Sequence, residues 1–296
     1  MTYDLIIVGA GPAGMTSAIY SARQKLKTLI ISKDFGGQMA QKAVEIENYP
    51  GFEKVTGFDL ISKMEKQVRD VDIVREKVLE VKKEDDVFIL KTESEKVFQS
   101  KVVIIATGAE PRRLNVIGET DYLGRGVSYC STCDGPLFKN KEIAIIGGGD
   151  AGFETAIFMK NYASKIYILE YGESVKSSLD NQKKAEGIEI ITSAQLKEIK
   201  GDNFVNQIIF DRLGKEETLD VKGVFIQAGY VPETSFLEDL VELNERKEIV
   251  VDFETFETKT KGLFAVGDVN CGKVKQIVVA CGQGAVAVIN GYKYIW

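Results

Sequence analysis

Residues 130–135 (CSTCDG) place two thiols three residues apart and a carboxylate directly after the second thiol. Thiols at this spacing can close into a disulfide that exchanges readily with other thiols. Such a pair is useful only when one group supplies electrons and another takes them away. We therefore expect the rest of the chain to contain the electron supply.

Two other interpretations of this segment have to be weighed. A CxxC pair is also half of a common zinc site, but Cys271 and Cys281 are ten residues apart and do not form a second CxxC. We therefore predict no metal, and expect Cys271 and Cys281 to be small buried residues. The carboxylate of Asp134, which precedes Gly135, could also belong to an ordinary turn.

Composition excludes several other functions. The 296-residue chain has no histidine, so a Ser-His-Asp triad, a Cys-His pair and a histidine metal site are impossible. A net charge of −6 argues against binding to nucleic acid. No apolar run is long enough to span a membrane, and the N-terminus lacks the basic region of a secretion signal. We expect a cytoplasmic protein.

The chain begins with a pattern typical of dinucleotide binding. Residues 3–8 (YDLIIV) have the apolar character of a buried parallel strand, residues 9–14 (GAGPAG) form a glycine turn, and residues 15–23 and 27–32 follow as helix and strand. In such a unit Gly9 makes the turn, Gly11 lets the backbone approach a pyrophosphate, and Gly14 lets helix and strand pack closely. The alternative to dinucleotide binding is that residues 9–14 form a glycine turn that binds no ligand.

The same pattern occurs a second time. Residues 142–146 (EIAII) predict a strand, residues 147–152 (GGGDAG) the turn, and residues 153–161 and 165–170 the helix and second strand. Gly147, Gly149 and Gly152 repeat the glycine spacing of the first turn. Two copies indicate either two ligands or one copy that is retained as a scaffold.

Each copy also contains an insertion with strand-like alternation. Residues 72–100 predict a small antiparallel sheet in the first copy, and residues 188–192, 204–210 and 217–221 predict one in the second. Residues 262–269 predict a last strand, and residues 276–292 a helix rich in small residues that can approach a ligand or sheet closely. The predicted fold is α/β, with two Rossmann-like, three-layer dinucleotide-binding domains that each carry an inserted antiparallel β-sheet.

With these parts in place, the chain resembles the low-molecular-weight flavin-dependent thioredoxin reductases over essentially its whole length. The matching motifs are residues 9–14, 36–38 (GGQ), 47–51 (ENYPG), 106–108 (ATG), 130–135, 267–268 (GD) and Gln276. The resemblance implies a discontinuous FAD-binding domain of residues 1–112 and 237–296. It implies a nicotinamide-domain-like redox domain of residues 113–236 that carries the CxxC.

The resemblance also assigns cofactor residues. Those expected to bind FAD are Gly9, Gly11, Pro12, Ala13, Gly14, Gly36, Gly37, Gln38, Asn48, Thr107, Gly108, Gly267, Asp268, Gln276 and Ile277. Among them, Gln38, Asn48 and Thr107 would line the isoalloxazine ring, and Asp268 would bind the ribitol. Gln276 would lie beside the flavin at the start of the last helix, where a helix N-terminus can stabilise negative charge.

The family's chemistry implies roles for the central motif. Reduced flavin would pass two electrons to the Cys130–Cys133 disulfide, with Cys133 closer to the flavin and Cys130 exchanging with a protein disulfide. Asp134 would transfer protons to or from the thiols. The implied partner is thioredoxin or a thioredoxin-like protein, and the implied assembly is a homodimer.

The sequence departs from the family at the electron donor. NADPH-dependent members carry a basic cluster after the second strand of the middle domain, whereas residues 170–176 (EYGESVK) contain no arginine or histidine. Glu170 would repel a 2′-phosphate and could accept a hydrogen bond from a ribose hydroxyl. Gly147, Gly149, Gly152 and Glu170 therefore form either an NADH site or a vestigial one. Because Ala151 and Phe153 depart from the pattern, we expect ferredoxin narrowly ahead of NADH, and not NADPH.

Other functions are less consistent with the chain. Flavoprotein partners of a peroxidase share this core but usually carry an additional N-terminal redox domain, and this sequence starts at the first strand. A flavin-binding redox sensor without turnover is a different class, against which the retained Cys130, Cys133 and Asp134 argue. Trp296, the only tryptophan, is expected to be a terminal packing residue.

Overall fold

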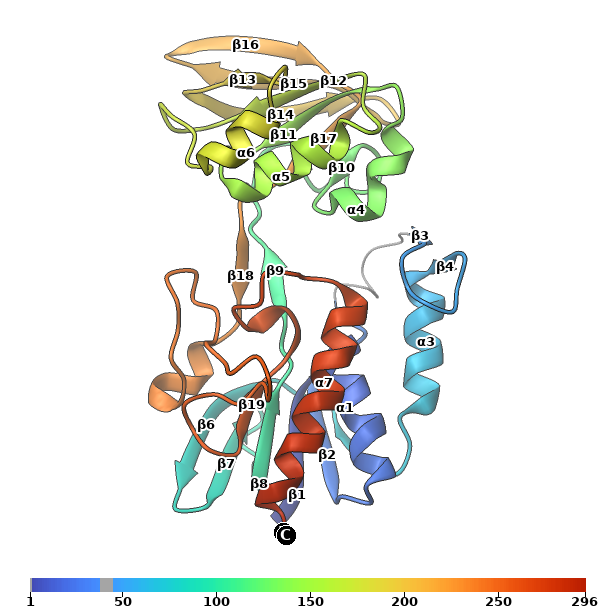
Figure 1. The fold of residues 1–296 in the computed structure, drawn as a ribbon, viewed down its shortest axis with the longest axis vertical. Coiled ribbons are helices and arrows are strands. Elements are labelled where there is room, and N and C mark those ends of the chain that lie inside the picture. The colour runs from blue at the N-terminus through green and yellow to red at the C-terminus, as the bar shows by residue number, and fades with distance from the viewer. Residues whose placement is uncertain (1, 38–44) are drawn as a thin grey trace. The chain divides into compact units, whose positions relative to one another are not determined.

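The computed structural model describes residues 2–37 and 45–296, which form two compact units (Figure 1). The first unit comprises Met1–Glu110 and Tyr230–Trp296, and the second comprises Pro111–Gly229. The boundaries expected from the sequence were 112/113 and 236/237. Strands β9 (Ala109–Pro111) and β18 (Tyr230–Pro232) pair with each other where the chain passes between the units, which accounts for the earlier second boundary.

The first unit is built on a large mixed sheet with the order β5-β2-β1-β8-β7-β6, and β19 pairs with β8. Its strands are β1 (Thr2–Ala10), β2 (Thr28–Phe35), β5 (Asp72–Val74), β6 (Val78–Glu84), β7 (Val87–Thr92), β8 (Val97–Ile105) and β19 (Leu263–Ala265). Strand β1 runs parallel to both β2 and β8. A short pair, β3 (Glu45–Ile46) and β4 (Val55–Thr56), lies apart from this sheet.

The antiparallel insertion predicted at residues 72–100 is confirmed for all of its strands except the first. Strand β5 is a parallel neighbour of β2, so it belongs to the main sheet. Strand β7 is antiparallel both to β6 and to the first half of β8, as the alternating pattern predicts. The second half of β8 pairs in parallel with β19. Strand β8 therefore belongs both to the antiparallel part of the sheet and to its parallel part, because its buried residues Val102–Ile105 continue the same pleat.

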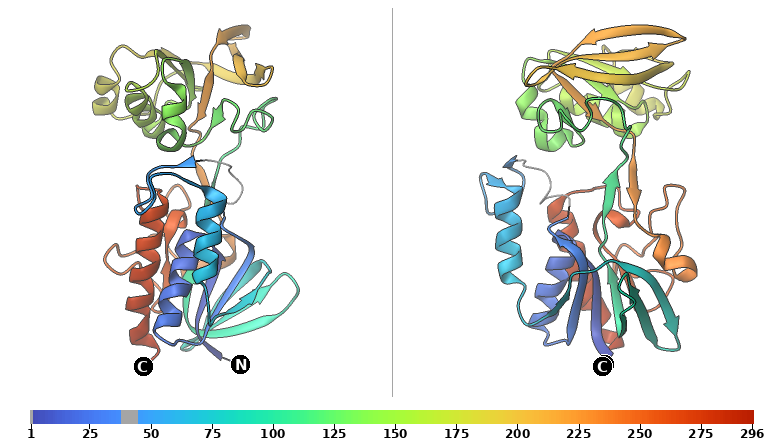
Figure 2. Two further views of the ribbon diagram at one scale, coloured as in Figure 1. Left: turned by 90° about the vertical axis from the view of Figure 1, so that its right-hand side faces the viewer. Right: turned by 180° about the vertical axis from the view of Figure 1, so that it is seen from behind.

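Three helices of the first unit pack on one face of this sheet (Figures 1 and 2): α1 (Pro12–Arg23), α3 (Gly57–Gln67) and α7 (Ile277–Gly291). Leu5 and Ile7 of β1 face these helices, whereas Ile6 and Val8 face the β6–β7 hairpin and the segment that follows η2 (Ser235–Leu240). Both faces of β1 are thus covered, as its continuous apolar run predicts.

Small residues let α7 approach α1 closely. A side chain at Gly284 would lie 2.4 Å from the carbonyl oxygen of Ala13 and 2.9 Å from Ser17 Oγ. The Ser17 hydroxyl donates to the Gly284 carbonyl at 3.2 Å. Helix α7 was expected to approach a ligand or a sheet closely. It instead approaches the first turns of α1, which follow the glycine turn.

The second unit contains a parallel sheet with the order β10-β17-β11-β12-β13. Its strands are β10 (Val127–Ser128), β11 (Glu142–Ile146), β12 (Lys165–Leu169), β13 (Glu189–Ile191) and β17 (Gly223–Ile226). A separate antiparallel sheet comprises β14 (Ala194–Gly201), β15 (Val205–Arg212) and β16 (Lys215–Asp220). The segment at 188–192, predicted as part of the insertion, instead forms β13 at the edge of the parallel sheet.

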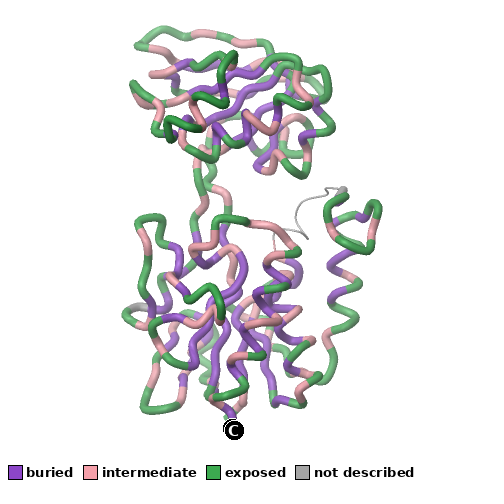
Figure 3. The backbone as a smooth tube through the Cα atoms, viewed as in Figure 1, coloured by how far each residue is buried: buried purple, intermediate pink, exposed green. Residues whose placement is uncertain are grey.

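These parts form three layers. Helix α5 (Asp150–Met159) packs in the core on one face with Ile143 and Ile145 of β11, and Ala185, the C-cap residue of α6 (Leu179–Lys184), joins the same core. The antiparallel sheet covers the other face, where Ala144 and Ile146 point. Figure 3 shows that strands in both units are largely buried. The predicted α/β class with Rossmann-type parallel sheets and additional antiparallel sheets is confirmed.

Two packing expectations were wrong. Trp296 is 90% exposed, and its ring lies beside that of Tyr292, 6.5 Å between centroids, because the core beneath is already closed by Ile295. Cys281 is buried as expected, but Cys271 is only half-buried. No helix within the described ranges 2–37 and 45–296 has the length and apolarity to cross a membrane.

Candidate functional site

In the second unit, Cys130 of the redox motif follows β10 closely, and the rest of the motif forms α4 (Ser131–Asp134) and the start of η1 (Gly135–Phe138). Cys130 and Cys133 form a disulfide with their Cα atoms 5.3 Å apart. Cys130 is half-buried and Cys133 is exposed. The bond that the spacing allows is therefore formed, and at least one of its sulfur-bearing residues is accessible to a reaction partner.

Asp134, half-buried beside the disulfide, is held by a serine that sequence reasoning did not single out. Ser128 Oγ donates to Asp134 Oδ2 at 2.6 Å. The Ser128 Oγ atom also accepts a hydrogen bond from the backbone N–H of Cys130 at 3.0 Å. Ser128 is only 3% exposed, since it lies in β10 within the sheet. The only sequence signal for it is a hydroxyl two residues before the first cysteine.

A buried carboxylate anchors the residue before Cys130. Glu119 is 2% exposed and accepts hydrogen bonds from the backbone N–H groups of residues 114–116 and from the hydroxyl of Tyr129. Burial raises the pKa of Tyr129, and the hydrogen bond to Glu119 raises it further. The phenol therefore stays protonated and keeps donating, which fixes the segment that leads into the disulfide.

The first glycine turn contains two glycines that the protein itself requires. Gly9 has φ +104°, and a side chain there would meet the Ala106 carbonyl oxygen at 2.4 Å. A side chain at Gly14 would lie 1.9 Å from the Gly9 carbonyl oxygen. Gly11 is different, because its φ of −74° suits any residue and no protein atom lies within 4 Å of an added Cβ. Its open side is the cradle that a pyrophosphate would fill.

The second glycine turn repeats this arrangement closely. A side chain at Gly147 would meet the Gln227 carbonyl oxygen at 2.5 Å, and one at Gly152 would meet the Gly147 carbonyl oxygen at 1.9 Å. Gly149 again has ordinary backbone angles and open space where a Cβ would point. Packing therefore explains two of the three glycines that the turns have in common, and leaves the middle one, Gly11 or Gly149, for a ligand.

Other residues predicted for the flavin gather around the first turn. An added Cβ at Gly37 would lie 3.6 Å from the Cα of Gly11, and the N–H of Gly36 donates to the Ala10 carbonyl at 2.8 Å. The side-chain amide of Asn48 donates to Gln276 Oε1 at 3.2 Å. Gln276 is the N-cap residue of α7, and Ile277 is the first residue of that helix. Gln38 lies outside the described residues.

The turn at Gly267-Asp268 is held by a buried polar network. Gln283 Oε1 accepts from the Gly267 N–H at 2.7 Å and from the Asn270 side-chain amide at 2.8 Å. Lys275 Nζ donates to the Asp268 carbonyl at 3.1 Å and forms an ion pair with Glu248, also at 3.1 Å. These contacts set the backbone on both sides of Asp268, and sequence reasoning missed all of their side chains.

Two further residues that are predicted to bind the flavin follow strand β8. Thr107 Oγ1 donates to the Glu233 carbonyl at 3.2 Å, and Gly108 follows with φ +73° and open space beside it. Burial raises the pKa of Tyr230, and the nearby negative charge of Asp268 raises it further. The Tyr230 side chain is therefore kept as a neutral phenol. Together these residues fit a dinucleotide with its pyrophosphate on α1.

Near the second turn, Glu170 uses both of its carboxylate oxygens on the backbone. Oε2 accepts from the Gly148 N–H at 2.6 Å, and Oε1 accepts from the Gly172 N–H at 2.8 Å. Asp150, the first residue of α5, accepts from the Ser178 N–H at 2.8 Å and the Ser177 hydroxyl at 2.9 Å. These hydrogen bonds lower the pKa of Asp150. The turn is thus flanked by two ionisable carboxylates.

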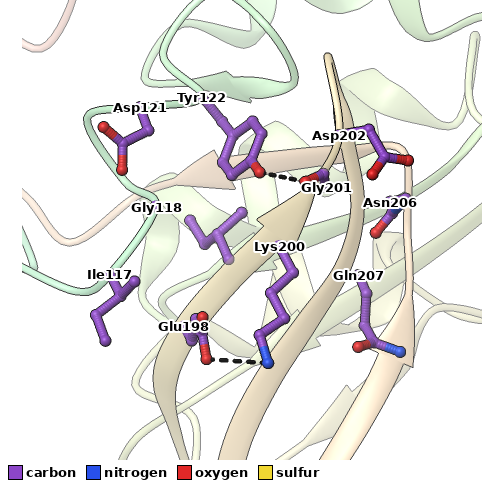
Figure 4. A pocket seen from close by; sticks show the side chains of 11 residues that line it. Ile117, Gly118, Asp121, Tyr122, Glu198, Lys200, Gly201, Asp202, Asn206 and Gln207 are labelled. Carbon is purple, nitrogen blue, oxygen red and sulfur yellow. Dashed lines mark hydrogen bonds and ion pairs between the residues drawn. The ribbon is translucent and has the colours of Figure 1, made fainter.

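A shallow hollow of about 440 Å³ elsewhere in the second unit holds none of the described site residues (Figure 4). Figure 4 shows Glu198 paired with Lys200 at 3.3 Å and the Tyr122 hydroxyl donating to the Gly201 carbonyl. Over the described ranges, no group of three or more cysteine, aspartate or glutamate side chains could hold a metal ion.

Comparison with known proteins agrees with this site. Residues 3–284 match the family model described as pyridine nucleotide-disulphide oxidoreductase. Thioredoxin reductase from Streptococcus pyogenes is 35% identical, with a TM-score of 0.91 and coverage of 99% of this chain and 98% of that one. A ferredoxin-flavin thioredoxin reductase from Clostridium acetobutylicum is 30% identical, with a TM-score of 0.56 over 100% of this chain and 98% of that one.

A third relative is longer than this chain. The F-type component of alkyl hydroperoxide reductase in Staphylococcus aureus is 39% identical over 99% of this chain, which spans 59% of that protein. Fold, redox disulfide and dinucleotide turns together define a flavoprotein oxidoreductase of the thioredoxin reductase type. The chain belongs to the pyridine nucleotide-disulphide oxidoreductase family.

Proposed function

We propose that this protein reduces the disulfide of thioredoxin or a thioredoxin-like protein by dithiol–disulfide exchange through Cys130 and Cys133. The observation that carries the proposal is the formed Cys130–Cys133 disulfide, in which Cys133 is exposed and Cys130, the residue we assign to exchange, is half-buried and so partly accessible. Exchange requires a thiolate that an incoming disulfide can reach. The 35% identity to a thioredoxin reductase over nearly the whole of both chains supports the same substrate class.

We assign FAD to the first unit and the exchange chemistry to the second. When bound, FAD supplies the two-electron reduction of the disulfide. In the first unit, Gly11 would leave room for the pyrophosphate, and Asp268 would accept hydrogen bonds from the ribitol hydroxyls. Gln276, the N-cap residue of α7, would place the N-terminus of that helix beside the flavin. In the second unit, Asp134 exchanges a proton with the thiols, and Cys130 attacks the substrate disulfide.

For the electron donor we now favour NADH over ferredoxin, the reverse of the order expected from the sequence. A glycine turn could persist for packing alone, and packing does explain Gly147, Gly148 and Gly152, but it does not explain Gly149. The open space at Gly149 favours a bound nucleotide. Glu170 lies beside that turn, and its negative charge disfavours the 2′-phosphate of NADPH. Ferredoxin remains a prediction, supported by the 30% identity to a ferredoxin-flavin thioredoxin reductase.

An anaerobic assay distinguishes the donors. The FAD-loaded protein is mixed separately with NADH, NADPH and dithionite-reduced ferredoxin, and flavin absorbance and thioredoxin thiols are followed. We expect rapid flavin bleaching with NADH, a rate at least about tenfold lower with NADPH, and thioredoxin reduction only with an active donor. Rapid bleaching by ferredoxin alone would reverse the donor assignment. Bleaching without any thioredoxin thiols would contradict the substrate proposal.

A second candidate is the reductase component of a hydroperoxide-reducing system. It is favoured by the 39% identity to the alkyl hydroperoxide reductase component over 99% of this chain. The same electron transfer would then serve a peroxidase with its own disulfide. Substituting a purified peroxiredoxin for thioredoxin in the assay tests this candidate, and peroxide consumption in the absence of thioredoxin would support it.

We also propose that the protein is a homodimer in the cytoplasm. The proposal rests on the resemblance to thioredoxin reductases and on the cysteine pair, which suits a reducing compartment. Sedimentation of the FAD-loaded protein at micromolar concentration tests the assembly, and a monomer mass of 32.7 kDa would contradict it.

A further inference from the structure

Ser128 occupies a position that links three parts of the redox motif. Its hydroxyl oxygen lies 2.6 Å from Asp134 Oδ2, 3.0 Å from the backbone nitrogen of Cys130 and 3.3 Å from the carbonyl oxygen of Cys130. The side chain is 3% exposed, so water has little access to compete for these bonds. The neighbouring Gly135 and Val127 are buried as well.

The Ser128 hydroxyl has one hydrogen-bonding arrangement for each protonation state of Asp134. One lone pair is taken by the Cys130 N–H, and a serine has a single hydrogen to donate. When Asp134 is ionised, that hydrogen points to Oδ2, since 2.6 Å is the separation of a charge-assisted O–H···O⁻ bond. When Asp134 is protonated, the carboxyl group can donate to Ser128, whose hydrogen then turns to the Cys130 carbonyl.

We propose that Ser128 is the positioning residue for proton transfer by Asp134, satisfying its carboxyl group in both protonation states. This inference rests on the proton-transfer role of Asp134 in the proposed function. Because the Ser128 oxygen is fixed by the Cys130 N–H, the carboxyl group is held in one orientation relative to the disulfide segment. Rotation of one O–H bond accompanies each proton transfer, and no heavy atom has to move.

The proton-transfer step balances without any further reactant. Two electrons from an added dithiol, which is itself oxidised to a disulfide and releases its two protons to water, cleave the S–S bond and leave two thiolates. Protonated Asp134 gives its proton to one thiolate and becomes a carboxylate, and water protonates the other. The Ser128 hydrogen then turns from the Cys130 carbonyl to Asp134 Oδ2. In the oxidative direction, each of these transfers reverses.

The test measures thiol reactivity and needs neither flavin nor electron donor. The chain is reduced with dithiothreitol, desalted anaerobically and mixed with Ellman's reagent in a stopped-flow instrument from about pH 4 to about pH 9. A C130S/C133S protein gives the contribution of Cys271 and Cys281, which is subtracted. In the plot of reaction rate against pH, we expect S128A to lower the plateau rate about tenfold. The rise on the acidic side, the acidic limb, should also move to a pH about one unit higher, because the ionised Asp134 carboxylate loses its hydrogen-bond donor.

Two further variants separate this role from a merely structural one. In a D134N background, S128A should cause no further shift of the acidic limb, since Ser128 is proposed to influence proton transfer through Asp134. S128T retains the hydroxyl and should restore the pH profile. S164A serves as the control, because Ser164 is an exposed serine of the same unit that lies outside the redox motif. It should behave as the wild type does.

The proposal is overturned if S128A leaves the acidic limb where it is, or if S128A shifts the acidic limb of D134N as much as it shifts that of the wild type. Either result would mean that Ser128 only supports the fold of the segment. Because the readout is independent of thioredoxin and of any donor, these outcomes remain distinct from a failure of the proposed enzyme activity.

Discussion

The side-chain amide of Asn48 donates to the side-chain carbonyl oxygen of Gln276 at 3.2 Å, although 228 residues separate them in the chain. Gln276 is the N-cap residue of α7, and Asn48 follows β3 near the opposite end of the sequence. The bond joins two residues that the resemblance assigns independently to the flavin ring. The first unit therefore assembles its candidate flavin site from both ends of the chain.

Replacing Asn48 by alanine should weaken FAD binding by about fivefold, because loss of one hydrogen bond between partly exposed groups costs about 1 kcal/mol. The fold should be unaffected, since the contact is exposed. Isothermal titration of the apoprotein with FAD gives the affinity. Alanine at the exposed Asn203 of the second unit is the matched control and should leave the affinity unchanged. Unchanged FAD affinity in N48A would remove Asn48 from the flavin site.

The glycines of the first turn should separate ligand binding from folding. Gly11→Ala should fold normally and lose FAD affinity at least about tenfold, since its Cβ meets no protein atom but projects into the pyrophosphate cradle. Gly14→Ala should instead destabilise the protein strongly, because its Cβ would lie 1.9 Å from the Gly9 carbonyl oxygen. Thermal unfolding and FAD titration of both variants distinguish the two effects. Full FAD affinity in G11A would contradict the cradle.

The same comparison applies to the second turn. Gly149→Ala should keep the fold and the flavin but lower the rate of flavin reduction by NADH at least about tenfold. Reduction by dithionite should be unchanged, which makes it the internal control. If NADH reduces G149A as fast as it reduces the wild type, the second turn does not bind a nucleotide.

Asp150 predicts a pH-dependent contribution to the stability of the second unit. Hydrogen bonds from the Ser178 N–H and the Ser177 hydroxyl lower its pKa below the ordinary 3.8, so the folded state favours the ionised form. The stabilisation is therefore present above pH 3.8 and disappears as the pH falls through the lowered folded pKa. D150N should lower Tm by a few degrees at neutral pH, and the difference should shrink below pH 3.8. A constant difference across this range would show that charge is not the cause.

The glycine turns and the strands around them were predictable because their pattern is local. The run at residues 3–8 has to be buried on both faces, and the structure places it as β1 with neighbours on each side. The spacing of Gly9, Gly11 and Gly14 reflects close backbone approaches that no other residue allows at two of those positions. Cys130 and Cys133 are likewise close enough in sequence to form their bond within one turn.

The rest depends on contacts between distant segments. Strand β5 joins the parallel sheet because of its neighbour β2, which no local pattern of residues 72–74 reveals. Strand β14 was not predicted at all, since its alternating residues 194–201 contain many charges. Ser128, Glu119 and Gln283 look like ordinary polar residues in the sequence, and only their burial and hydrogen bonds indicate that they position the site.

The central claim is that a bound flavin and the Cys130–Cys133 disulfide form one electron-transfer system. Anaerobic reductive titration with dithionite tests it most directly, with flavin absorbance and free thiols recorded at each addition. We expect the FAD-loaded wild type to take up about four electrons per chain, two for the flavin and two for the disulfide, and the flavin-containing Cys133→Ser variant to take up about two. An equal uptake of about two electrons by both proteins, or a wild-type protein that cannot bind FAD, would contradict the account.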